Sequence, residues 1–492
     1  MTTSAGAPTV SASSPSTESI LQDLGKQIGL DLSEHNATIT GRDPVVPSTH
    51  RIGDACAAAL ALAGTAVSQV AHVRGSALDK ISISVDEAIM QLTAAFYTKL
   101  NGVALLRLFE DPKLFHNSDF YPTKDGRHVF LLLTYPRLRD AACQVLQCPP
   151  EKKDFAKSIE QWNAFELEEA INQSHGCAIA LRTRQEWREH PQGKALLQQD
   201  LISVTKIGES DPFPLSPLSQ PDLTKENVSL PLEGIRLLDN GHVIAAPIVS
   251  RLAAEFGADV LHISSPDHPD SAAMLNETGL GKLNAFCDLN EESGRRGFAD
   301  IISEADIYVC NYRSLELKGY SADELAKLKP GIIFVDITGW GRTGPWATRG
   351  GFDQLACTAT GFSAEEGSFA APRLPPTYLL NDYLAGILGF AGALSALLRR
   401  AQEGGSYVVS LNLASVVMWV QNLGSFEHKD VEHLSPIDHN VAADKLDSVW
   451  GPNGNCTYLG VRIGFDRIKP HFKRGAQPAG ASPLSWSQFS QT

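Results

Sequence analysis

Long apolar runs and clusters of positive charge are both missing from this chain. It has no run of about 18 apolar residues, the length that a membrane-spanning helix needs. The nearest candidate, Tyr383–Leu398, is interrupted by three glycines and a serine. Lysine and arginine form no basic run, and clusters of these residues are what binds phosphate backbones or anionic lipids. These two absences exclude a membrane span and argue against nucleic acid as a partner.

Common cysteine, metal and nucleophile motifs are missing too. The eight cysteines are scattered with no CxxC pair, and the HExxH, P-loop and GxSxG motifs are absent. The sequence therefore predicts reduced thiols, no zinc site and a cytoplasmic location. The N-terminal residues lack the basic start and apolar stretch of a secretory signal. Their Ser, Thr and Pro content predicts a disordered tail over residues 1–43.

What is present fits a globular enzyme of several domains. The chain has 492 residues, which predicts about two to four domains at roughly 100–200 residues each. Its 42 Lys and Arg against 56 Asp and Glu give a formal net charge of −14. Hydrophobic residues make up 43% and charged residues 20%, which is ordinary for a soluble protein and leaves ample material for a core.

The alternation of short apolar strands with amphipathic helices dominates residues 232–430. Runs such as Ile235–Asp239, Asp259–Ile263 and Ile332–Ile337 predict buried strands, and Pro247–Phe256 has helical spacing. This rhythm predicts an α/β fold with a doubly wound, Rossmann-like parallel sheet, which binds ligands beyond the carboxyl ends of its strands.

The remaining segments have a different character. Residues 111–207, with a hairpin at Tyr121–Leu133 and helical stretches around Pro136–Leu146, Phe155–Ser174 and Thr183–Leu201, predict a smaller α+β domain. A Pro- and Ser-rich linker at 208–231 separates it from the large domain. Residues 431–492 form a C-terminal extension.

An internal similarity links the Ala-rich helix predicted at Asp54–Val73 with the helix beginning near Asp382. With Asp54 placed on Asp382, identical residues follow at Ala57, Leu60, Ala63 and Gly64, and after a two-residue gap Ile83-Ser84 lies on Val409-Ser410. Residues 44–110 are therefore predicted to be a partial copy of the large-domain helix region.

Two turns of the predicted sheet bear on phosphate binding. The first strand leads into Asn240–Pro247, which has one glycine, so the GxGxxG cradle of a dinucleotide enzyme is missing. The Gly-rich loop Gly339–Trp346 follows a later strand, where Trp340 or Trp346 could stack on a planar base and Arg342 or Arg349 could neutralise phosphates. The alternative is a plain turn with solvated arginines.

Asp382 opens the long apolar helix, and its position allows two roles. It could cap the helix, since acidic residues favour the first turn. It could also be a carboxylate nucleophile, because a desolvated Asp at a helix start can attack a carbonyl and the helix N-terminus steadies negative charge. Position alone leaves both open.

Several segments together resemble one known family, the class III CoA-transferases (the CaiB/BaiF group). In residues 232–424 the matching segments are LEGIRLLDNGHVIAAPIVSRLAAEFGADVL, CNYRSLELKGYSADELAKLKPGIIFVDITGWGRTGPW, GGFDQLACTATG and NDYLAGILGFAGALSALLRRAQEGG. Upstream, FYPTKDGRHVFLLL, IEQWNAFELEEAI and RTRQEWREHPQG are similar to the small domain of that family. The chain thus resembles a rearranged, partly duplicated member.

The resemblance implies an activity and a nucleophile. It implies transfer of CoA between an acyl-CoA and a carboxylic acid acceptor through a mixed anhydride and an aspartyl-CoA thioester on Asp382. No metal or redox cofactor is implied, and a homodimer is possible. It also implies that CoA and its acyl group lie near the following residues: His242 and Val243 beside the acyl pocket, Asn311 and Tyr312 near the adenine, Lys282 near the CoA phosphates, and Gly351-Phe352-Asp353 in the loop that faces the thioester. With so few cations near these segments, Arg313 and Arg342 are the other candidates to hold the phosphates.

Departures from the family pattern keep alternatives open. The racemase branch uses a histidine where this chain has Phe352, which favours transfer over racemisation or isomerisation. The basic and acidic residues that usually end the second strand are His262 and Ser264 here, so a degenerate CoA-binding protein is another possibility. Asp54 is a second candidate nucleophile, or a structural counterpart of Asp382.

Overall fold

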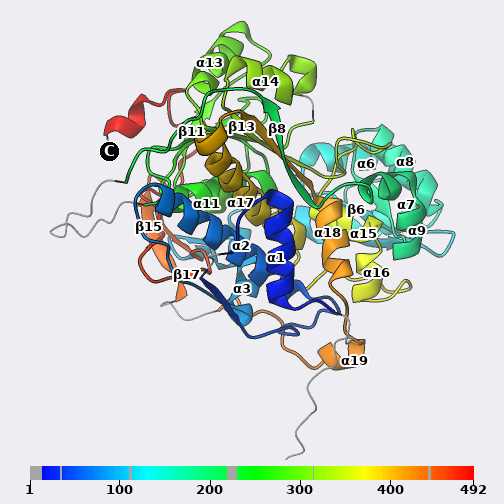
Figure 1. The fold of residues 1–492 in the computed structure, drawn as a ribbon. Coiled ribbons are helices and arrows are strands. Elements are labelled where there is room, and N and C mark those ends of the chain that lie inside the picture. Colours follow the sequence, from blue (N-terminus) through cyan, green and yellow to red (C-terminus); the bar gives the residue numbers. More distant parts are fainter. Residues whose placement is uncertain are drawn as a thin grey trace, which may run out of the picture.

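A seven-stranded sheet organises the protein (Figure 1). The computed structural model describes residues 14–33, 36–109, 113–218, 230–313, 315–440 and 445–491. The strand order is β11-β10-β9-β12-β13-β14-β8, and every neighbouring pair is parallel except β14 and β8. The strands are β8 (Ile202–Gly208), β9 (Arg236–Asn240), β10 (Asp259–Ser264), β11 (Leu283–Phe286), β12 (Ile307–Cys310), β13 (Ile333–Thr338) and β14 (Ser406–Asn412). Counted from β9, this is the order of a doubly wound nucleotide-binding sheet, which confirms the predicted fold class.

Both faces of the sheet are covered, which explains why its strands are nearly continuous in apolar residues. Leu237 and Leu238 are adjacent in β9 and enter two different cores, as the alternation of a strand requires. One core contains α11 (Ala245–Glu255) and α17 (Leu380–Glu403), which pack on each other. The other contains α13 (Glu292–Ser303) and α14 (Ala322–Leu328).

The smaller α+β unit lies to one side of this sheet, at the right of Figure 1. Its antiparallel sheet has the order β5-β6-β7 and its own core. The elements are β5 (Asp119–Pro122), β6 (His128–Leu131), β7 (Ala178–Ala180), α5 (Lys113–Asn117), α6 (Pro136–Leu146), α7 (Lys152–Ile159), α8 (Ala164–Gln173), α9 (Arg184–Glu189) and α10 (Pro191–Leu196). The chain then returns through β8 as the antiparallel edge of the large sheet, so the boundary predicted at residue 207 falls inside a strand of that sheet.

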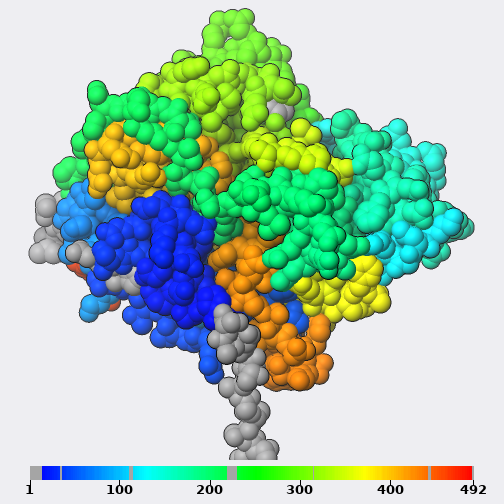
Figure 2. All heavy atoms as spheres, turned by 45° about the vertical axis from the view of Figure 1, so that its right-hand side comes forward, coloured from blue at the N-terminus to red at the C-terminus, as the bar shows by residue number. Residues whose placement is uncertain are grey.

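The predicted disordered tail is wrong for the described residues before Asp43. They contain α1 (Thr17–Ile28) and β1 (Ala37–Thr40); residues 1–13 of the predicted tail lie outside the described ranges. The Ser16 hydroxyl caps α1 by accepting from the Ser19 amide, and Gly29 ends it at φ +67°. Ile20, Leu21, Leu24 and Ile28 are buried at helical spacing. Composition concealed this amphipathic helix, which lies on the surface beside α18 (Leu413–Asn422) in Figure 2.

The N-terminal part of the fold shares two sheets with the C-terminal extension. After β1 the chain continues through α2 (Ile52–Val73), β2 (Ile81–Ser84), α3 (Val85–Gln91) and α4 (Ala94–Tyr97). The extension supplies β17 (Gly464–Phe465) to the sheet β1-β2-β17, and β15 (Asp447–Gly451) and β16 (Gly454–Tyr458) to a sheet with β3 (Lys99–Leu100) and β4 (Val103–Ala104). The C-terminal extension is therefore part of the fold.

Two helices, α2 and α17, are long and apolar enough to cross a membrane by length and composition alone. The sequence criterion of an uninterrupted apolar run did not find these two helices, because it counted glycines and other small residues as interruptions. Their most apolar windows are 83% and 89% buried inside the protein, and the two helices pack side by side (Figure 1). Such burial is typical of core helices in a globular fold.

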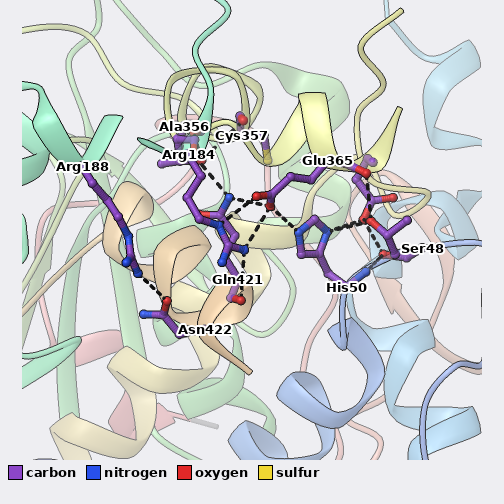
Figure 3. A network of polar contacts seen from close by, with 12 residues as sticks. Ser48, His50, Arg184, Arg188, Ala356, Cys357, Glu365, Gln421 and Asn422 are labelled. Atoms are coloured by element: carbon purple, nitrogen blue, oxygen red, sulfur yellow. Dashed lines mark hydrogen bonds and ion pairs between the residues drawn. The ribbon is translucent and has the colours of Figure 1, made fainter. Parts of the chain in front are cut away.

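The buried side chain of His50, just before α2, links the N-terminal elements to other parts of the chain (Figure 3). His50 Nδ1 lies 2.6 Å from Glu366 and its Nε2 lies 2.9 Å from Glu365, both in α16 (Phe362–Glu366). Because both partners are carboxylates, both ring nitrogens donate and the imidazole is charged. Glu365 also binds Arg184 of α9 at 2.8 Å and Gln421 of α18 at 2.9 Å. The His50 network thus ties three parts of the chain together.

We expect His50→Gln to lower the free energy of unfolding by about 3–5 kcal/mol at pH 6, because it leaves the buried Glu366 carboxylate without its cation. Burial acts to lower the pKa of His50, but hydrogen bonds and charge from Glu365 and Glu366 raise it overall. The stabilisation is therefore complete below about pH 6.5 and is lost as the pH rises through the raised pKa. Denaturant titrations at pH 6 and pH 9 measure this difference.

The control is Arg188→Gln, which removes the exposed hydrogen bond to Asn422 in Figure 3 and is expected to cost under about 0.5 kcal/mol at either pH. An effect of His50→Gln that is the same at both pH values would contradict a charged His50.

Candidate active site

The candidate site lies where the strand order reverses, between the carboxyl ends of β9 and β12. The Asn311 side chain joins the two turns: its Oδ1 accepts from the His242 amide at 2.9 Å and its Nδ2 donates to the His242 carbonyl at 2.7 Å. Val243 has φ +71°, a left-handed conformation that a β-branched residue rarely adopts. Ligands bind at this position in doubly wound sheets, and stored backbone strain is typical of such sites.

Two aspartates meet at the start of α17. Asp382 stands in its first turn and Asp353 begins α15 (Asp353–Ala359). Asp353 Oδ2 accepts from the backbone amides of Asn381 at 2.5 Å and Asp382 at 3.0 Å. Asp353 therefore satisfies the helix end, and the capping role considered for Asp382 belongs to Asp353. No described residue donates a hydrogen bond to the Asp382 carboxylate, which is 8% exposed.

Burial makes both carboxyl groups reluctant to ionise. It raises the pKa of Asp353 to about 7, against the lowering effect of the two amides that it accepts. It also raises the pKa of Asp382 well above its ordinary value, and the charge of Asp353 adds to that rise. The two groups form an acidic pair in which ionisation of one opposes ionisation of the other.

Aromatic rings line the space around this acidic pair. The Tyr135 ring comes from the start of α6 in the small domain and lies 5.8 Å from His242 and 5.9 Å from Phe352, centroid to centroid. Tyr312 lies 6.0 Å from His242, also centroid to centroid. Burial raises the pKa of the Tyr135 hydroxyl, and the charges of Asp270 and Asp382 raise it further. Tyr135 therefore lies near both the His242 turn and Phe352, the residue that precedes Asp353.

Sequence reasoning did not single out Tyr135 or Asp270, and placed Asp353 only in a loop that faces the thioester. Tyr135 comes from another domain, and its one local signal is the following Pro136 at a helix start. Asp353 gave a weak signal as an acid before an Ala-rich helix. No local pattern indicates that residues 135, 270, 353 and 382 meet.

The expected CoA cations are placed less favourably than predicted. Lys282 is 1% exposed, and its ammonium donates to Asp239 at 2.7 Å, the Pro247 carbonyl at 2.9 Å and Ser250 at 2.7 Å. All three of its donors are used, so the expectation that it meets the CoA phosphates does not fit this arrangement. Arg342 is paired with Asp336 through two hydrogen bonds of 2.8 and 2.6 Å.

Arg313 remains at the surface, where its guanidinium donates to the Thr348 carbonyl. Arg349 is paired with Glu168 and Glu169 of the small domain. Trp340 and Trp346 are buried and pack with Trp187, so neither offers a face to a planar base, contrary to the stacking expectation. The Gly-rich loop instead docks the small domain, since Gln192 of α10 donates to the Trp340 carbonyl at 2.7 Å.

A second acidic pair, Asp43 and Asp54, repeats the geometry of the first. Asp54 lies in the first turn of α2, and Asp43 Oδ2 accepts from its amide at 2.7 Å. Burial, with the charge of Asp54, raises the pKa of Asp43 to about 7, the value that Asp353 also has. The difference is that Asp54 is fully engaged: Arg51 Nε donates to it at 2.8 Å and the Thr17 hydroxyl at 2.9 Å.

The surrounding elements are repeated as well. β1, α2, β2 and α3 follow the same order as β13, α17, β14 and α18, and β1–β2 and β13–β14 are both parallel. The helix after each second strand has Ser84 or Asn412 as its N-cap residue. Thirty residues separate Asp54 from Ser84 and Asp382 from Asn412. The two-residue gap of the sequence comparison is therefore wrong, because the copies correspond without it.

Comparisons with known proteins agree with this architecture. A family model described as CoA-transferase family III matches residues 34–209 and 232–478. The unmatched residues 210–231 coincide with the predicted linker. The chain is 27% identical over 430 residues to the "Acetyl-coenzyme A transferase nodX" of Hypoxylon pulicicidum, which covers 78% of this chain and 71% of that protein.

It is also 32% identical over 226 residues to the "Succinyl-CoA--L-malate CoA-transferase alpha subunit" of Chloroflexus aurantiacus, over 42% of this chain and 52% of that subunit. Among solved structures, a CAIB/BAIF family protein from Brucella suis aligns with 21% identity and a TM-score of 0.35 over 46% of this chain and 65% of that one. The chain belongs to CoA-transferase family III, a family of enzymes.

We expect Asp382→Asn to raise the free energy of unfolding by about 1–3 kcal/mol at pH 8, because it removes a buried carboxylate that has no hydrogen-bond donor. The pKa of Asp382 is raised in the folded state, so the ionised group destabilises the fold above its ordinary pKa, and the gain disappears near pH 4. Denaturant midpoints at pH 8 and pH 4 test this.

Asp54→Asn is the matched control in the second copy. It breaks the buried pair with Arg51 and is expected to lower stability by about 3–5 kcal/mol at pH 8. Equal destabilisation by both substitutions would contradict the difference between the two acidic pairs.

Proposed function

We propose that the protein transfers CoA from an acyl-CoA to a carboxylic acid, with the Asp382 carboxylate as the covalent nucleophile. The observation that carries this proposal is the difference in hydrogen bonding between the two aspartates. Asp353 accepts the amides at the start of α17, and the Asp382 carboxylate stays unpaired and almost buried beside the crevice. A carboxylate that serves no structural purpose yet is held out of water is a candidate for chemistry.

In the first half of the reaction, an Asp382 oxygen attacks the thioester carbonyl carbon. A C–O bond forms, the C–S bond breaks, and its electron pair leaves with sulfur as the CoA thiolate. The thiolate then attacks the Asp382 carbonyl of the mixed anhydride, which releases the acyl group as a carboxylate and leaves an aspartyl-CoA thioester. The acceptor carboxylate reverses these steps and departs as the new acyl-CoA.

The surroundings of Asp382 suit such a nucleophile. An ionised carboxylate in this site is poorly solvated, so little hydration has to be removed before it attacks. It stands in the first turn of a 24-residue helix, whose N-terminal dipole favours negative charge on the carboxylate and on the tetrahedral intermediate. The raised pKa that accompanies burial means that the reacting fraction increases with pH.

The names of the relatives support transfer rather than racemisation, since nodX and the Chloroflexus subunit are both named as CoA-transferases. In this proposal acyl-CoA and a carboxylic acid are the substrates, and no metal or redox cofactor takes part. We also propose a cytoplasmic location and a homodimer. Arg313, Asn311 and Tyr312 remain the proposed contacts of the nucleotide part of CoA.

Asp382→Ala is expected to abolish transfer, by at least about 10³-fold, because the covalent route is lost. Transfer from acetyl-CoA or succinyl-CoA to acetate, succinate or L-malate, followed by chromatography of the acyl-CoA products, measures this. The control is Arg51→Lys, which lies in the second copy and is expected to keep transfer within about threefold. Full activity of folded Asp382→Ala would overturn the proposal.

The rate of transfer is expected to rise with pH from about 5 and level off above the raised pKa of Asp382, because its ionised form reacts. A pH profile of kcat/KM for the acyl-CoA donor tests this. A rate that stays flat down to pH 5 would show that the essential carboxylate has an ordinary pKa.

A further inference from the structure

A row of alternating charges leads from the core to the crevice. Lys282 lies 2.7 Å from Asp239, whose Oδ2 lies 3.1 Å from His262 Nδ1. His262 Nε2 lies 2.8 Å from Asp270 Oδ2, and the other oxygen of Asp270 contacts His242 Nδ1. The first four groups are almost fully buried, whereas the His242 side chain is 29% exposed. The row therefore ends in one accessible imidazole.

The hydrogen bonds fix the charges on the four buried members of the row. Both neighbours of His262 are carboxylates, so both of its ring nitrogens donate and it is an imidazolium. Burial acts to lower the pKa of His262, but the charges and hydrogen bonds of Asp239 and Asp270 raise it to about 9. Lys282 and His262 thus balance Asp239 and Asp270, and the four buried groups sum to zero. A protonated His242 is then the net positive charge of the row.

The free end of His242 points to a role. Asp270 contacts Nδ1, and no described residue forms a hydrogen bond with Nε2. The ring packs near Tyr135 and Tyr312, and Tyr135 also packs near Phe352, the residue before Asp353. Because Asp353 accepts from the Asp382 amide, these contacts place His242 on the same side of the fold as the nucleophile. Of the cations considered for this site, Lys282 and Arg342 are committed to carboxylates, and Arg313 is exposed.

The charge balance changes between the two halves of the reaction. Once CoA is attached to Asp382, that side chain is a neutral thioester and Asp353 remains as an acid. The acceptor then has to bring its own carboxylate into a crevice bordered by Asp353 and Asp270. A hydrogen-bonded positive group is needed at that step, and an imidazole supported by a carboxylate provides one.

We propose that His242 is the specificity-determining residue that binds the carboxylate of the acid acceptor through Nε2–H, and that His262 is its positioning residue, acting through Asp270. The inference rests on the proposed function, because it concerns the second half of that reaction. Because His262 neutralises Asp270, the Asp270 carboxylate that contacts His242 does not cancel the positive charge of His242. No bond is made or broken on His242: it holds the acceptor while the acceptor oxygen attacks the Asp382 thioester.

Steady-state kinetics of His242→Gln, with succinyl-CoA as donor and acetate as acceptor, separate the two substrates. The KM for acetate is expected to rise about 10- to 100-fold, the range for a lost hydrogen bond to a charged group. The KM for succinyl-CoA is expected to change far less. The control variant is His433→Gln, an exposed histidine in the C-terminal extension, which is expected to leave both constants unchanged.

Hydroxylamine supplies an uncharged competitor of acetate. It traps the Asp382 thioester without a carboxylate, so its trapping rate is expected to fall much less in His242→Gln than the reaction with acetate. If the thioester is trapped on Asp382 but the KM for acetate is unchanged, the role of His242 is wrong and the proposed function stands. If Asp382 is never labelled although transfer proceeds, the proposed function itself fails.

The His262→Gln variant tests the positioning role without a change at His242. In the wild-type protein Asp270 is held by His262 and in turn contacts the His242 ring. Without His262, Asp270 loses one of its two partners and no longer fixes the His242 ring, so the KM for acetate is expected to rise while the KM for succinyl-CoA changes far less. An unchanged KM for acetate, or an equal rise in both constants, would overturn the inference.

Discussion

The capping of α17 by Asp353 is the interaction on which the site depends. A helix start needs an acceptor for its free amides, and the nearest acid in sequence, Asp382, would ordinarily fill that need. Asp353 comes from a different helix and takes two of these amides. Asp382 is thereby released from a structural task, held in the first turn of the helix and kept out of water. The reactivity that we propose for Asp382 follows from that position.

The second copy shows what happens when the same geometry is neutralised. Asp43 caps α2 as Asp353 caps α17, yet Asp54 is bound by Arg51 and Thr17. The Asp43–Asp54 pair is therefore neutralised by the Arg51 guanidinium, whereas no described cation pairs with Asp382. Since α2 and α17 pack together in the core, the neutralised copy supports the helix that carries Asp382. Duplication here supplies a scaffold for one site.

Sequence patterns predicted the large sheet well, because its strands are buried on both faces and its helices have a clear apolar stripe. β10 begins at the predicted residue and ends one residue later than predicted, and α6 has the predicted bounds. The stretch predicted at Thr183–Leu201 is instead two helices, α9 and α10, with Pro191 starting the second. α1 was missed since its amphipathic pattern follows a tail rich in Ser and Thr.

The site was predictable only in part, and the reason is physical. The helix start and its acid are local, so the sequence could single out Asp382, and a resemblance between sequences suggested the role that we propose for it. The partner of a charged residue need not be local: nothing near Lys282 in the sequence indicates that Asp239 already neutralises it. Tyr135 and Asp270 reach the crevice from separate elements. Their part in the site emerges only when the fold brings them together.

The most direct test is to identify the side chain that carries CoA. The full-length protein is incubated with succinyl-CoA, quenched with hydroxylamine and digested, and every aspartate and glutamate peptide is sequenced by mass spectrometry. The account predicts a hydroxamate on Asp382 alone, dependent on the acyl-CoA. A hydroxamate on Asp54 or Asp353, or transfer with no labelled carboxylate, would contradict it.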